Sequence, residues 1–197
     1  MTRILPVRHG QSEWNALGRW QGQADPPLSE LGRQQAFSAS RRIGTVDAIV
    51  SSDLQRAMET AQIISGQLGV GPVMVEPLFR ERDAGEWSGL TREEIDERYP
   101  GYLEERRRPP GYEPDDSLLG RTHEALGRVE EEFRGGEILV VAHGGLVYAL
   151  EKEHGHEFDR LPNLGARWLT HDGTRIVLGD RILLVEGDEI TSVPAQI

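Results

Sequence analysis

Residues 137–142 read Glu-Ile-Leu-Val-Val-Ala and give the strongest strand signal in the chain. A run in which nearly every position is apolar is expected of a strand that is buried on both faces, as strands of parallel sheets are. The run ends directly in His143, Gly144 and Gly145. A shorter apolar strand, Ile4 to Val7, ends in the same manner in Arg8, His9 and Gly10. The sequence therefore predicts two buried strands that each deliver a histidine and a glycine at their carboxyl ends.

The segments between these strands alternate between helical and strand patterns. Ser29 is a predicted N-cap for a helix that extends to about Ile43, and Thr91 forms a capping box with Glu94 at the start of another helix. Further predicted elements are a strand at 47–51, a helix at 53–68, a short strand at 73–75, a helix at 115–133, and a helix that runs from the second His-Gly pair to about residue 150. We therefore predict an α/β fold, a three-layer sandwich with a mostly parallel central sheet and helices on both faces. The tail alternates β-rich runs with Asp-Gly and Gly-Asp turns, which predicts a C-terminal β-hairpin region.

Length and composition limit the class of protein. The 197 residues suit one domain, which we expect to span residues 1–197, and 37% hydrophobic with 28% charged residues is typical of a soluble globular protein. No apolar run is long enough to span a bilayer or to form a signal peptide, so we expect no membrane partner and a cytoplasmic location. The absence of cysteine excludes disulfides, a thiol nucleophile and thiolate metal sites. A formal net charge of −11 argues against a nucleic-acid partner, but not against a small phosphate held by a few arginines.

The two His-Gly pairs predict a binding site for a phosphate group. Ligands of open α/β sheets bind beyond the carboxyl ends of the strands, so the two imidazoles converge if their strands are neighbours. Glycines such as Gly10 and Gly144 let a bound group approach the backbone closely, and Arg8 adds a bidentate phosphate donor. Arg56 is predicted in the first turn of the helix that follows Ser51 and Ser52, where helix geometry already favours an anion.

Five ordered sequence blocks resemble one known family. The blocks are RHGQSEWN (8–15), GQADPPLSELGRQQA (22–36), SSDLQRAMETA (51–61), FRERDAGEWSGLTREEI (79–95) and VVAHGG (140–145). They resemble the successive signatures of the histidine phosphatase superfamily, in its phosphoglycerate mutase-like branch, and extend over nearly three quarters of the chain. A single Arg-His-Gly tripeptide would be weak evidence, whereas five blocks in the family's order are specific.

The resemblance implies roles for particular residues. His9 is implied to be a nucleophile that becomes phosphohistidine, with Arg8, Arg56 and His143 around the phosphoryl group. Glu81 is implied to be the proton donor and acceptor, and Ser12, Asn15, Gln21 and Gly22 match positions on the phosphate or substrate side of the pocket. The implied reaction is the metal-independent hydrolysis of a small phosphate ester, without a cofactor. Relatives are often dimeric, which leaves a homodimer open.

Each of these residues also has an ordinary structural interpretation. A histidine after a strand is often only a hydrogen-bonded structural group, Arg56 could be a surface charge of its helix, and Glu81 is chosen over Asp83 mainly on the family match. His154 and His156 lack further ligands in sequence and fit a surface position better than a metal site. The triplet Arg106, Arg107 and Arg108 could attract a second anionic group of the substrate, although a solvated face is the more common role of such a run.

Two departures from the family bear on the function. The segment between Glu81 and His143 is shorter than in the glycolytic mutases, which favours a phosphatase over a mutase. Relatives often carry Gly-Glu-Ser before the helix that leads to the second histidine, whereas this chain has Asp115, Asp116 and Ser117, so a contact from this position is not carried over. A phosphoglycerate mutase that depends on a bisphosphate primer stays open as an alternative, as does an inactive phosphate-binding module. Substrate selectivity is expected to lie in the loops around residues 100–120 and in the tail.

Overall fold

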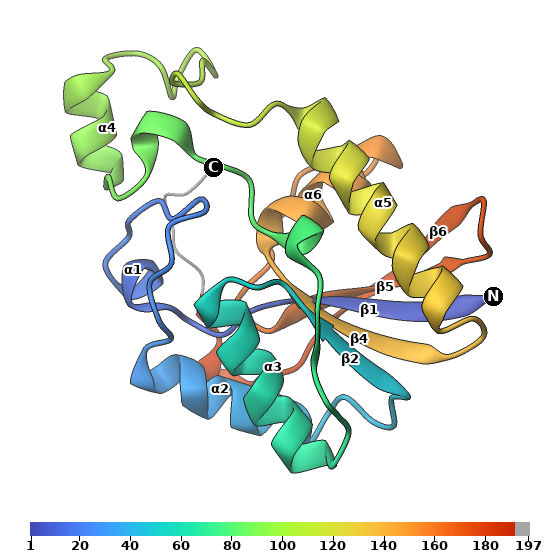
Figure 1. Ribbon diagram of the computed structural model, residues 1–197. Coiled ribbons are helices and arrows are strands. Elements are labelled where there is room, and N and C mark those ends of the chain that lie inside the picture. Colours follow the sequence, from blue (N-terminus) through green and yellow to red (C-terminus); the bar gives the residue numbers. More distant parts are fainter. Residues whose placement is uncertain (192–197) are drawn as a thin grey trace.

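The chain folds around one six-stranded mixed sheet (Figure 1). The strands are β1 (Thr2–Arg8), β2 (Ala48–Ser51), β3 (Met74–Val75), β4 (Glu137–Ala142), β5 (Gly165–His171) and β6 (Ile176–Leu183), in the spatial order β3-β2-β4-β1-β5-β6. The four strands from β3 to β1 are parallel, whereas β5 and β6 are antiparallel. The structure is a computed structural model that describes residues 1–191.

Helices cover both faces of the sheet. On one face lie α2 (Glu30–Ser40) and α3 (Gln55–Leu68), and on the other α5 (Asp115–Glu132) and α6 (Gly144–Glu153). The short helices α1 (Glu13–Ala16) and α4 (Arg92–Arg98) lie beyond the carboxyl end of β1. This arrangement confirms the predicted three-layer α/β sandwich. Within residues 1–191, no helix combines the length and the apolar character needed to cross a bilayer.

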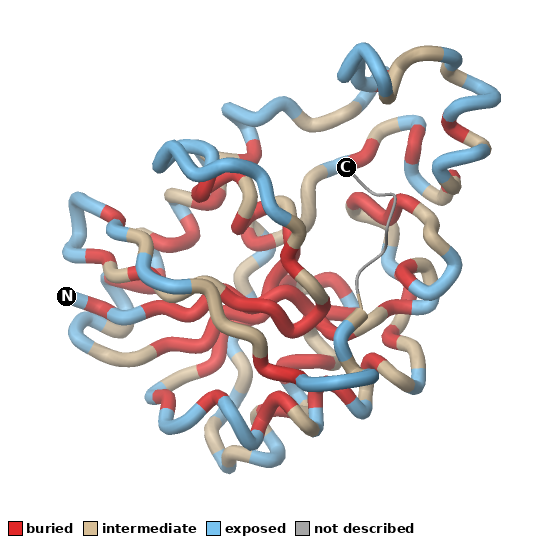
Figure 2. The backbone as a smooth tube through the Cα atoms, turned by 180° about the vertical axis from the view of Figure 1, so that it is seen from behind, coloured by how far each residue is buried: buried red, intermediate tan, exposed pale blue. Residues whose placement is uncertain are grey.

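Two hydrophobic cores explain why β4 is apolar at nearly every position. Ile138 and Val140 pack in the core shared with α5 and α6, whereas Leu139 and Val141 pack in the core shared with α2 and α3. Successive strand residues point to opposite faces, so a strand covered on both sides needs apolar residues in succession. Burying each such side chain contributes roughly 1.5–3 kcal/mol. Figure 2 shows that the buried residues are concentrated in the middle of the sheet.

The helix starts inferred from capping patterns agree with the structure. Ser29 Oγ accepts a hydrogen bond from the backbone N–H of Gly32 at the start of α2. Thr91 and Glu94 form the predicted capping box at the start of α4. Helix α1, in contrast, lies in a region predicted as loop, because four residues are too few to display a helical period.

As far as residue 191, the C-terminal region contains a single hairpin, formed by β5 and β6 and closed by a turn at Asp172 and Gly173. The Asp172 carboxylate accepts hydrogen bonds from the backbone N–H groups of Thr174 and Arg175, which stabilises this turn. The Gly-Asp pair at 179–180 is not a turn but lies within β6. Gly179 packs against Trp168, where a Cβ would lie 3.2 Å from the Trp168 Cβ, so this glycine permits close packing. The part of the predicted tail beyond residue 191 lies outside the described residues.

Candidate active site

Strand register brings the two histidines together. β1 and β4 are parallel neighbours, and their last residues, Arg8 and Ala142, lie opposite each other. The residue that follows β1 is His9, and the residue that follows β4 is His143. Their ring centroids are 5.1 Å apart, and the ring planes are inclined by 63°. Both side chains are buried. The predicted convergence of the two imidazoles therefore follows directly from the pairing of the two apolar strands.

Two hydrogen bonds define the tautomer of His9. Its Nδ1 lies 2.6 Å from the carbonyl oxygen of Gly10, and its Nε2 lies 3.1 Å from Nε of Arg56. A carbonyl oxygen can only accept and a guanidinium can only donate, so a neutral His9 carries its proton on Nδ1 and its lone pair on Nε2. Burial, Arg56 and Arg8 hold the pKa of His9 well below 6.5. At neutral pH the ring is therefore uncharged, with Nε2 able to act as a nucleophile.

Two buried guanidinium groups make this pocket electropositive. Arg56, in the first turn of α3, donates to the carbonyl oxygens of Ala24 at 2.7 Å and Gly22 at 2.8 Å. Burial lowers its pKa to about 10, so it remains a cation at neutral pH. Arg8 donates to the carbonyl oxygen of Leu161 at 2.7 Å, and burial lowers its pKa as well. Neither arginine forms an ion pair with a carboxylate of residues 1–191. Two buried cations without a carboxylate partner favour the binding of an anionic group at this place.

His143 adds an unpaired ring nitrogen to the pocket. Its Nε2 lies 3.0 Å from Ser52 Oγ, whereas its buried Nδ1 has no hydrogen-bond partner within the described part of the chain. Burial, Arg56 and His9 hold the pKa of His143 well below 6.5. His143 is also the N-cap residue of α6, so the positive end of a ten-residue helix faces the same place.

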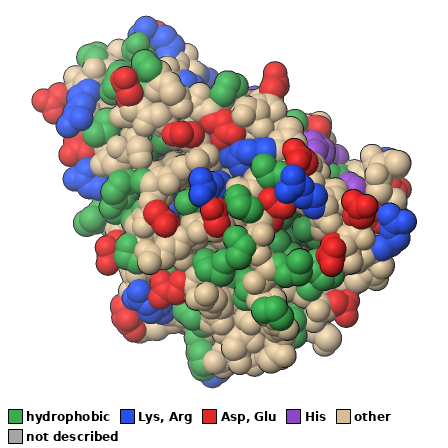
Figure 3. Space-filling view, viewed as in Figure 1, with side chains coloured by type: hydrophobic (Ala, Val, Ile, Leu, Met, Phe, Trp, Pro, Cys, Tyr) green, Lys and Arg blue, Asp and Glu red, His purple; other side chains and the backbone are tan. Residues whose placement is uncertain are grey.

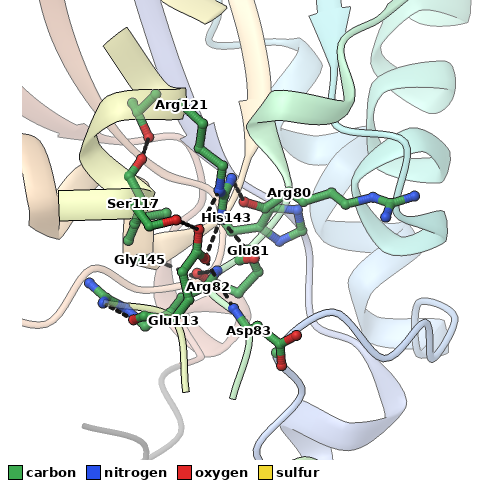
Figure 4. A network of polar contacts seen from close by, with 12 residues as sticks. Arg80, Glu81, Arg82, Asp83, Glu113, Ser117, Arg121, His143 and Gly145 are labelled. Atoms are coloured by element: carbon green, nitrogen blue, oxygen red, sulfur yellow. Dashed lines mark hydrogen bonds and ion pairs between the residues drawn. The ribbon is translucent and has the colours of Figure 1, made fainter. Parts of the chain in front are cut away.

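Glu81 reaches the pocket from the segment that follows Phe79. Its carboxylate accepts hydrogen bonds from the backbone N–H groups of Arg82 at 2.7 Å and Gly145 at 3.3 Å. A Cβ on Gly145 would lie only 2.1 Å from Glu81 Oε1, so the absence of a side chain is what allows this approach. Asp83, the alternative in sequence, is exposed, and its carboxylate accepts from the backbone of Gly85. Figure 4 shows Glu81 beside Gly145 and His143.

An ion pair between two half-buried side chains holds the segment that carries Glu81. Arg121 of α5 donates to the backbone carbonyl oxygens of Leu78, Arg80 and Glu81, and forms two hydrogen bonds of 2.7 Å with the carboxylate of Glu113. The side chains of Arg121 and Glu113 are only 15% and 10% exposed. Burial alone would raise the pKa of Glu113, but the hydrogen bonds from Arg121 lower this pKa overall. Figure 4 shows Arg121 reaching from α5 toward this segment. No local sequence pattern marks this pair, although Glu113 lies just before Asp115, Asp116 and Ser117, which replace the Gly-Glu-Ser of relatives.

A cavity of about 730 Å³ opens in front of these groups. Six of the predicted site residues line it, namely Arg8, His9, Gln21, Gly22, Glu81 and Gly144. Arg56 and His143 lie outside the lining, in contact with His9. Ser12 and Asn15 also lie outside it and form a capping box for α1, in which Ser12 Oγ accepts from the backbone N–H of Asn15. Ser12 Oγ in turn donates to Gln21 Oε1 at 2.6 Å, so Ser12 acts on the cavity wall through Gln21.

Several lining residues were not predicted from the sequence. Among them are Trp20, Tyr112, Tyr148, Phe158 and Arg160. They come from distant segments and carry no local motif, so only the fold reveals that they meet. The arginine triplet is divided: Arg108 lines the cavity with its guanidinium 5.0 Å from the ring of Tyr112, whereas Arg107 lies over Tyr102 and Arg106 is exposed.

The two histidines after α6 make other contacts. His154 lies 2.8 Å from the carbonyl oxygen of Leu150, and His156 lies 3.0 Å from Arg167. No group of three or more His, Asp or Glu side chains suited to a metal ion occurs in the described range. Acidic and basic side chains are interspersed over the face shown in Figure 3, so the net charge of −11 is not concentrated in one patch there.

Known proteins are similar to this chain both in sequence and in fold. A model of the histidine phosphatase superfamily (branch 1) matches residues 4–176. The glucosyl-3-phosphoglycerate phosphatase of Mycolicibacterium vanbaalenii is 36% identical, over 90% of this chain and 87% of that protein. A metal-independent phosphoserine phosphatase of Arabidopsis thaliana is 35% identical, over 76% of this chain and 67% of that protein. The structure of a mycobacterial glucosyl-3-phosphoglycerate phosphatase in complex with VO3 superposes with a TM-score of 0.81 at 32% identity, over 90% of this chain and 96% of that one. The chain thus belongs to the histidine phosphatase superfamily.

Proposed function

We propose that this protein hydrolyses small phosphate monoesters through a covalent phosphohistidine on His9. The observation that carries the proposal is the state of His9, a buried neutral imidazole whose Nε2 lone pair faces a pocket with two arginines. Phosphoryl transfer needs mainly positioning and neutralisation of charge on the phosphoryl oxygens. Arg8, Arg56 and the free Nδ1 of His143 supply donors for those oxygens.

The reaction then proceeds in two displacements. In the first, Nε2 of His9 attacks phosphorus, the bond to the ester oxygen breaks, and Glu81 protonates the departing alkoxide. In the second, Glu81 takes a proton from water, the water oxygen attacks phosphorus, and the P–N bond breaks to release inorganic phosphate and neutral His9. Glu81 thus gives one proton to the alkoxide in the first step and takes one back from water in the second, so the two steps together leave it unchanged. Charge neutralisation by arginine lets this cycle run without a metal ion.

Similar proteins support a phosphatase rather than a mutase. Two relatives are named as phosphatases of phosphoserine and of glucosyl-3-phosphoglycerate, both of which are small phosphate esters. Mutase activity would also require a bisphosphate primer and a phosphohistidine that is protected from water. The cavity of about 730 Å³ is open to substrates of the size of a phosphorylated sugar, hydroxy acid or amino acid.

Phosphate release over a panel of esters tests this function. The protein is first treated exhaustively with chelator, and no bisphosphate is added. We expect release of inorganic phosphate from several monoesters, with no gain from added divalent ions, and loss of release in His9→Ala. Turnover that requires a bisphosphate primer would indicate a mutase instead, and activity restored only by a divalent ion would contradict the cationic-pocket mechanism.

A further inference from the structure

Asn163 holds the backbone of the proposed nucleophile from a distant part of the chain. It lies in the connection between α6 and β5, is fully buried, and its Nδ2 donates to the carbonyl oxygen of His9 at 2.9 Å. The backbone N–H of the next residue, Leu164, donates to the carbonyl oxygen of Arg8 at 3.0 Å. Leu164 has a φ of 55°, an uncommon backbone conformation for leucine that persists only where its surroundings determine it. Two consecutive residues are thus fixed against the backbone of Arg8 and His9.

A chain of hydrogen bonds determines which end of the Asn163 amide faces His9. The backbone N–H of Gln11 can only donate, so the atom of Gln35 that lies 2.7 Å from it is the acceptor Oε1. Gln35 Nε2 therefore points the other way and donates to Thr191 Oγ1 at 2.7 Å. The Thr191 hydroxyl in turn donates to Asn163 Oδ1 at 3.1 Å. The remaining end of the amide, Nδ2, is left to donate to His9.

This clamp of three side chains, Gln35, Thr191 and Asn163, joins separate parts of the fold. Gln35 belongs to α2, Thr191 follows β6, and both Gln35 and Asn163 are fully buried. The two ends of the clamp bind Gln11 and His9, which are close together in the loop that follows β1. A buried hydrogen-bond network in which each member has its partners is rigid, and removing one member disturbs the others. The three side chains therefore act on this loop as a unit.

The clamp fixes the peptide group between His9 and Gly10. Asn163 binds the carbonyl oxygen of this peptide group, and Thr60 Oγ1 accepts from its N–H, which belongs to Gly10, at 3.1 Å. The peptide plane is therefore held at both of its polar atoms. The next carbonyl along the chain, that of Gly10, accepts from Nδ1 of the His9 ring at 2.6 Å. Fixing this plane thus helps to place the acceptor that orients the imidazole and its Nε2.

We propose that Asn163 is a positioning residue for His9, which keeps Nε2 aimed at phosphorus through the peptide group between His9 and Gly10. This inference rests on the phosphatase function proposed above. Asn163 does not line the cavity, so it acts on the substrate only through His9. In the proposed mechanism, Arg8 and Arg56 hold the phosphoryl group with their own donors. Loss of the clamp should therefore slow the attack on phosphorus more than it weakens phosphate binding.

Two substitutions of Thr191, which does not line the cavity, test the clamp. Thr191→Val removes the hydroxyl that sets the direction of the Asn163 amide, whereas Thr191→Ser keeps it. In single turnover with nitrophenyl phosphate, we expect Thr191→Val to phosphorylate His9 about 10- to 100-fold more slowly than the wild type, since a small displacement of a reacting group has an effect of this size. Inhibition by inorganic phosphate should change by less than about threefold, because binding in the ground state does not need the aimed imidazole. Thr191→Ser should retain most of the wild-type rate.

Asn163→Asp provides a second variant, at the contact itself. It keeps the size of the side chain but places a carboxylate oxygen, which cannot donate, opposite the His9 carbonyl oxygen. We expect a loss of phosphorylation rate at least as large as that of Thr191→Val. If this variant does not fold, the two Thr191 variants decide. As a control, Thr174→Val at the exposed turn between β5 and β6 removes a hydroxyl that donates to Asp172, and it should leave the rate unchanged.

The outcomes separate this role from a merely structural one and from the proposed function. Wild-type phosphorylation in Thr191→Val, or equal losses in Thr191→Val and Thr191→Ser, would overturn the positioning role and leave the phosphatase intact. A loss of phosphate binding as large as the loss of rate would overturn it as well, because the pocket as a whole would then have changed. Failure of the wild-type protein to phosphorylate His9 or to release phosphate would instead contradict the phosphatase function itself.

Discussion

Glu81 is placed to transfer a proton, and leaving-group chemistry can isolate that role. An alkyl alkoxide needs protonation as it departs, whereas nitrophenolate is stable enough to leave unaided. Glu81→Gln should therefore slow the phosphorylation step of an alkyl phosphate by about 100- to 10,000-fold, the usual contribution of a general acid, and that of nitrophenyl phosphate far less. The comparison requires single-turnover kinetics, because in the proposed second step Glu81 also activates water, and that loss would be the same for every ester. Equal losses for the two esters would remove Glu81 from the acid role, and Asp83 would be tested next.

Gly145 controls where the Glu81 carboxylate lies. Gly145→Ala places a Cβ at a position only 2.1 Å from Glu81 Oε1, so the carboxylate must move away from the pocket. Since a misplacement of about 1 Å can reduce a rate about 100-fold, we expect a loss of that order for an alkyl phosphate. Stability should not fall, because alanine favours a helix over glycine by about 1 kcal/mol.

The matched control for this change is Gly127→Ala in α5, where a Cβ would meet no atom within 4 Å. Its activity should equal that of the wild type. Wild-type activity in Gly145→Ala, measured beside this control, would show that the position of the Glu81 carboxylate does not matter.

Helix α5 acts on the site through Arg121. Arg121→Met removes the donors to the carbonyl oxygens of Leu78, Arg80 and Glu81 and leaves the Glu113 carboxylate unpaired. We expect the free energy of unfolding to fall by about 1–3 kcal/mol, because the variant leaves a half-buried carboxylate and backbone carbonyl oxygens without these donors. Arg128→Gln on the same helix removes an arginine whose side chain is 56% exposed, and it should change stability by less than about 1 kcal/mol. Urea titration measures both values.

A positioning role for Arg121 also predicts a kinetic pattern. Glu113→Gln keeps the volume of the side chain and weakens the pair, so it should fold even if Arg121→Met does not. It should slow alkyl phosphates more than nitrophenyl phosphate, because it acts through Glu81. A uniform loss for both esters would mean that the pair supports only the fold.

The elements of the sheet could be predicted from sequence more fully than the wall of the cavity. The apolar run of β4 and the capping patterns at Ser29 and Thr91 are local signals, and the elements they predicted are present. The meeting of His9 with His143 needed only the assumption that two buried parallel strands are neighbours. Arg121 could not be found in the same way. Its significance depends on contacts with distant backbone atoms, which leave no pattern in the adjacent sequence.

The two buried histidines link the stability of the fold to pH. Burial lowers the pKa of His9 and of His143 well below 6.5, so these side chains bind protons in the unfolded chain at a higher pH than in the folded one. As the pH falls below about 6.5, the unfolded state is favoured by up to about 1.4 kcal/mol per pH unit for each histidine. Carboxylates with a lowered pKa, such as Glu113, act in the same direction only below about pH 4.

Chemical denaturation between about pH 7 and pH 5 measures this dependence, because histidine is the side chain that titrates in this range. The free energy of unfolding should fall with pH in the wild type, and the slope should be shallower in His143→Gln. A free energy of unfolding that stays constant or rises as the pH falls to 5 would show that these imidazoles are not buried in the neutral state.

In the proposed mechanism, sheet register, buried arginines and helix termini together serve one event, the transfer of a phosphoryl group to Nε2 of His9. Rapid quenching after brief mixing with a phosphorus-labelled ester, followed by peptide mapping, observes that event directly. We predict an acid-labile, base-stable phosphoryl group on the peptide that contains His9, and no such adduct in His9→Ala. Label on Ser12, or full hydrolytic activity in His9→Ala, would contradict the proposed role of His9.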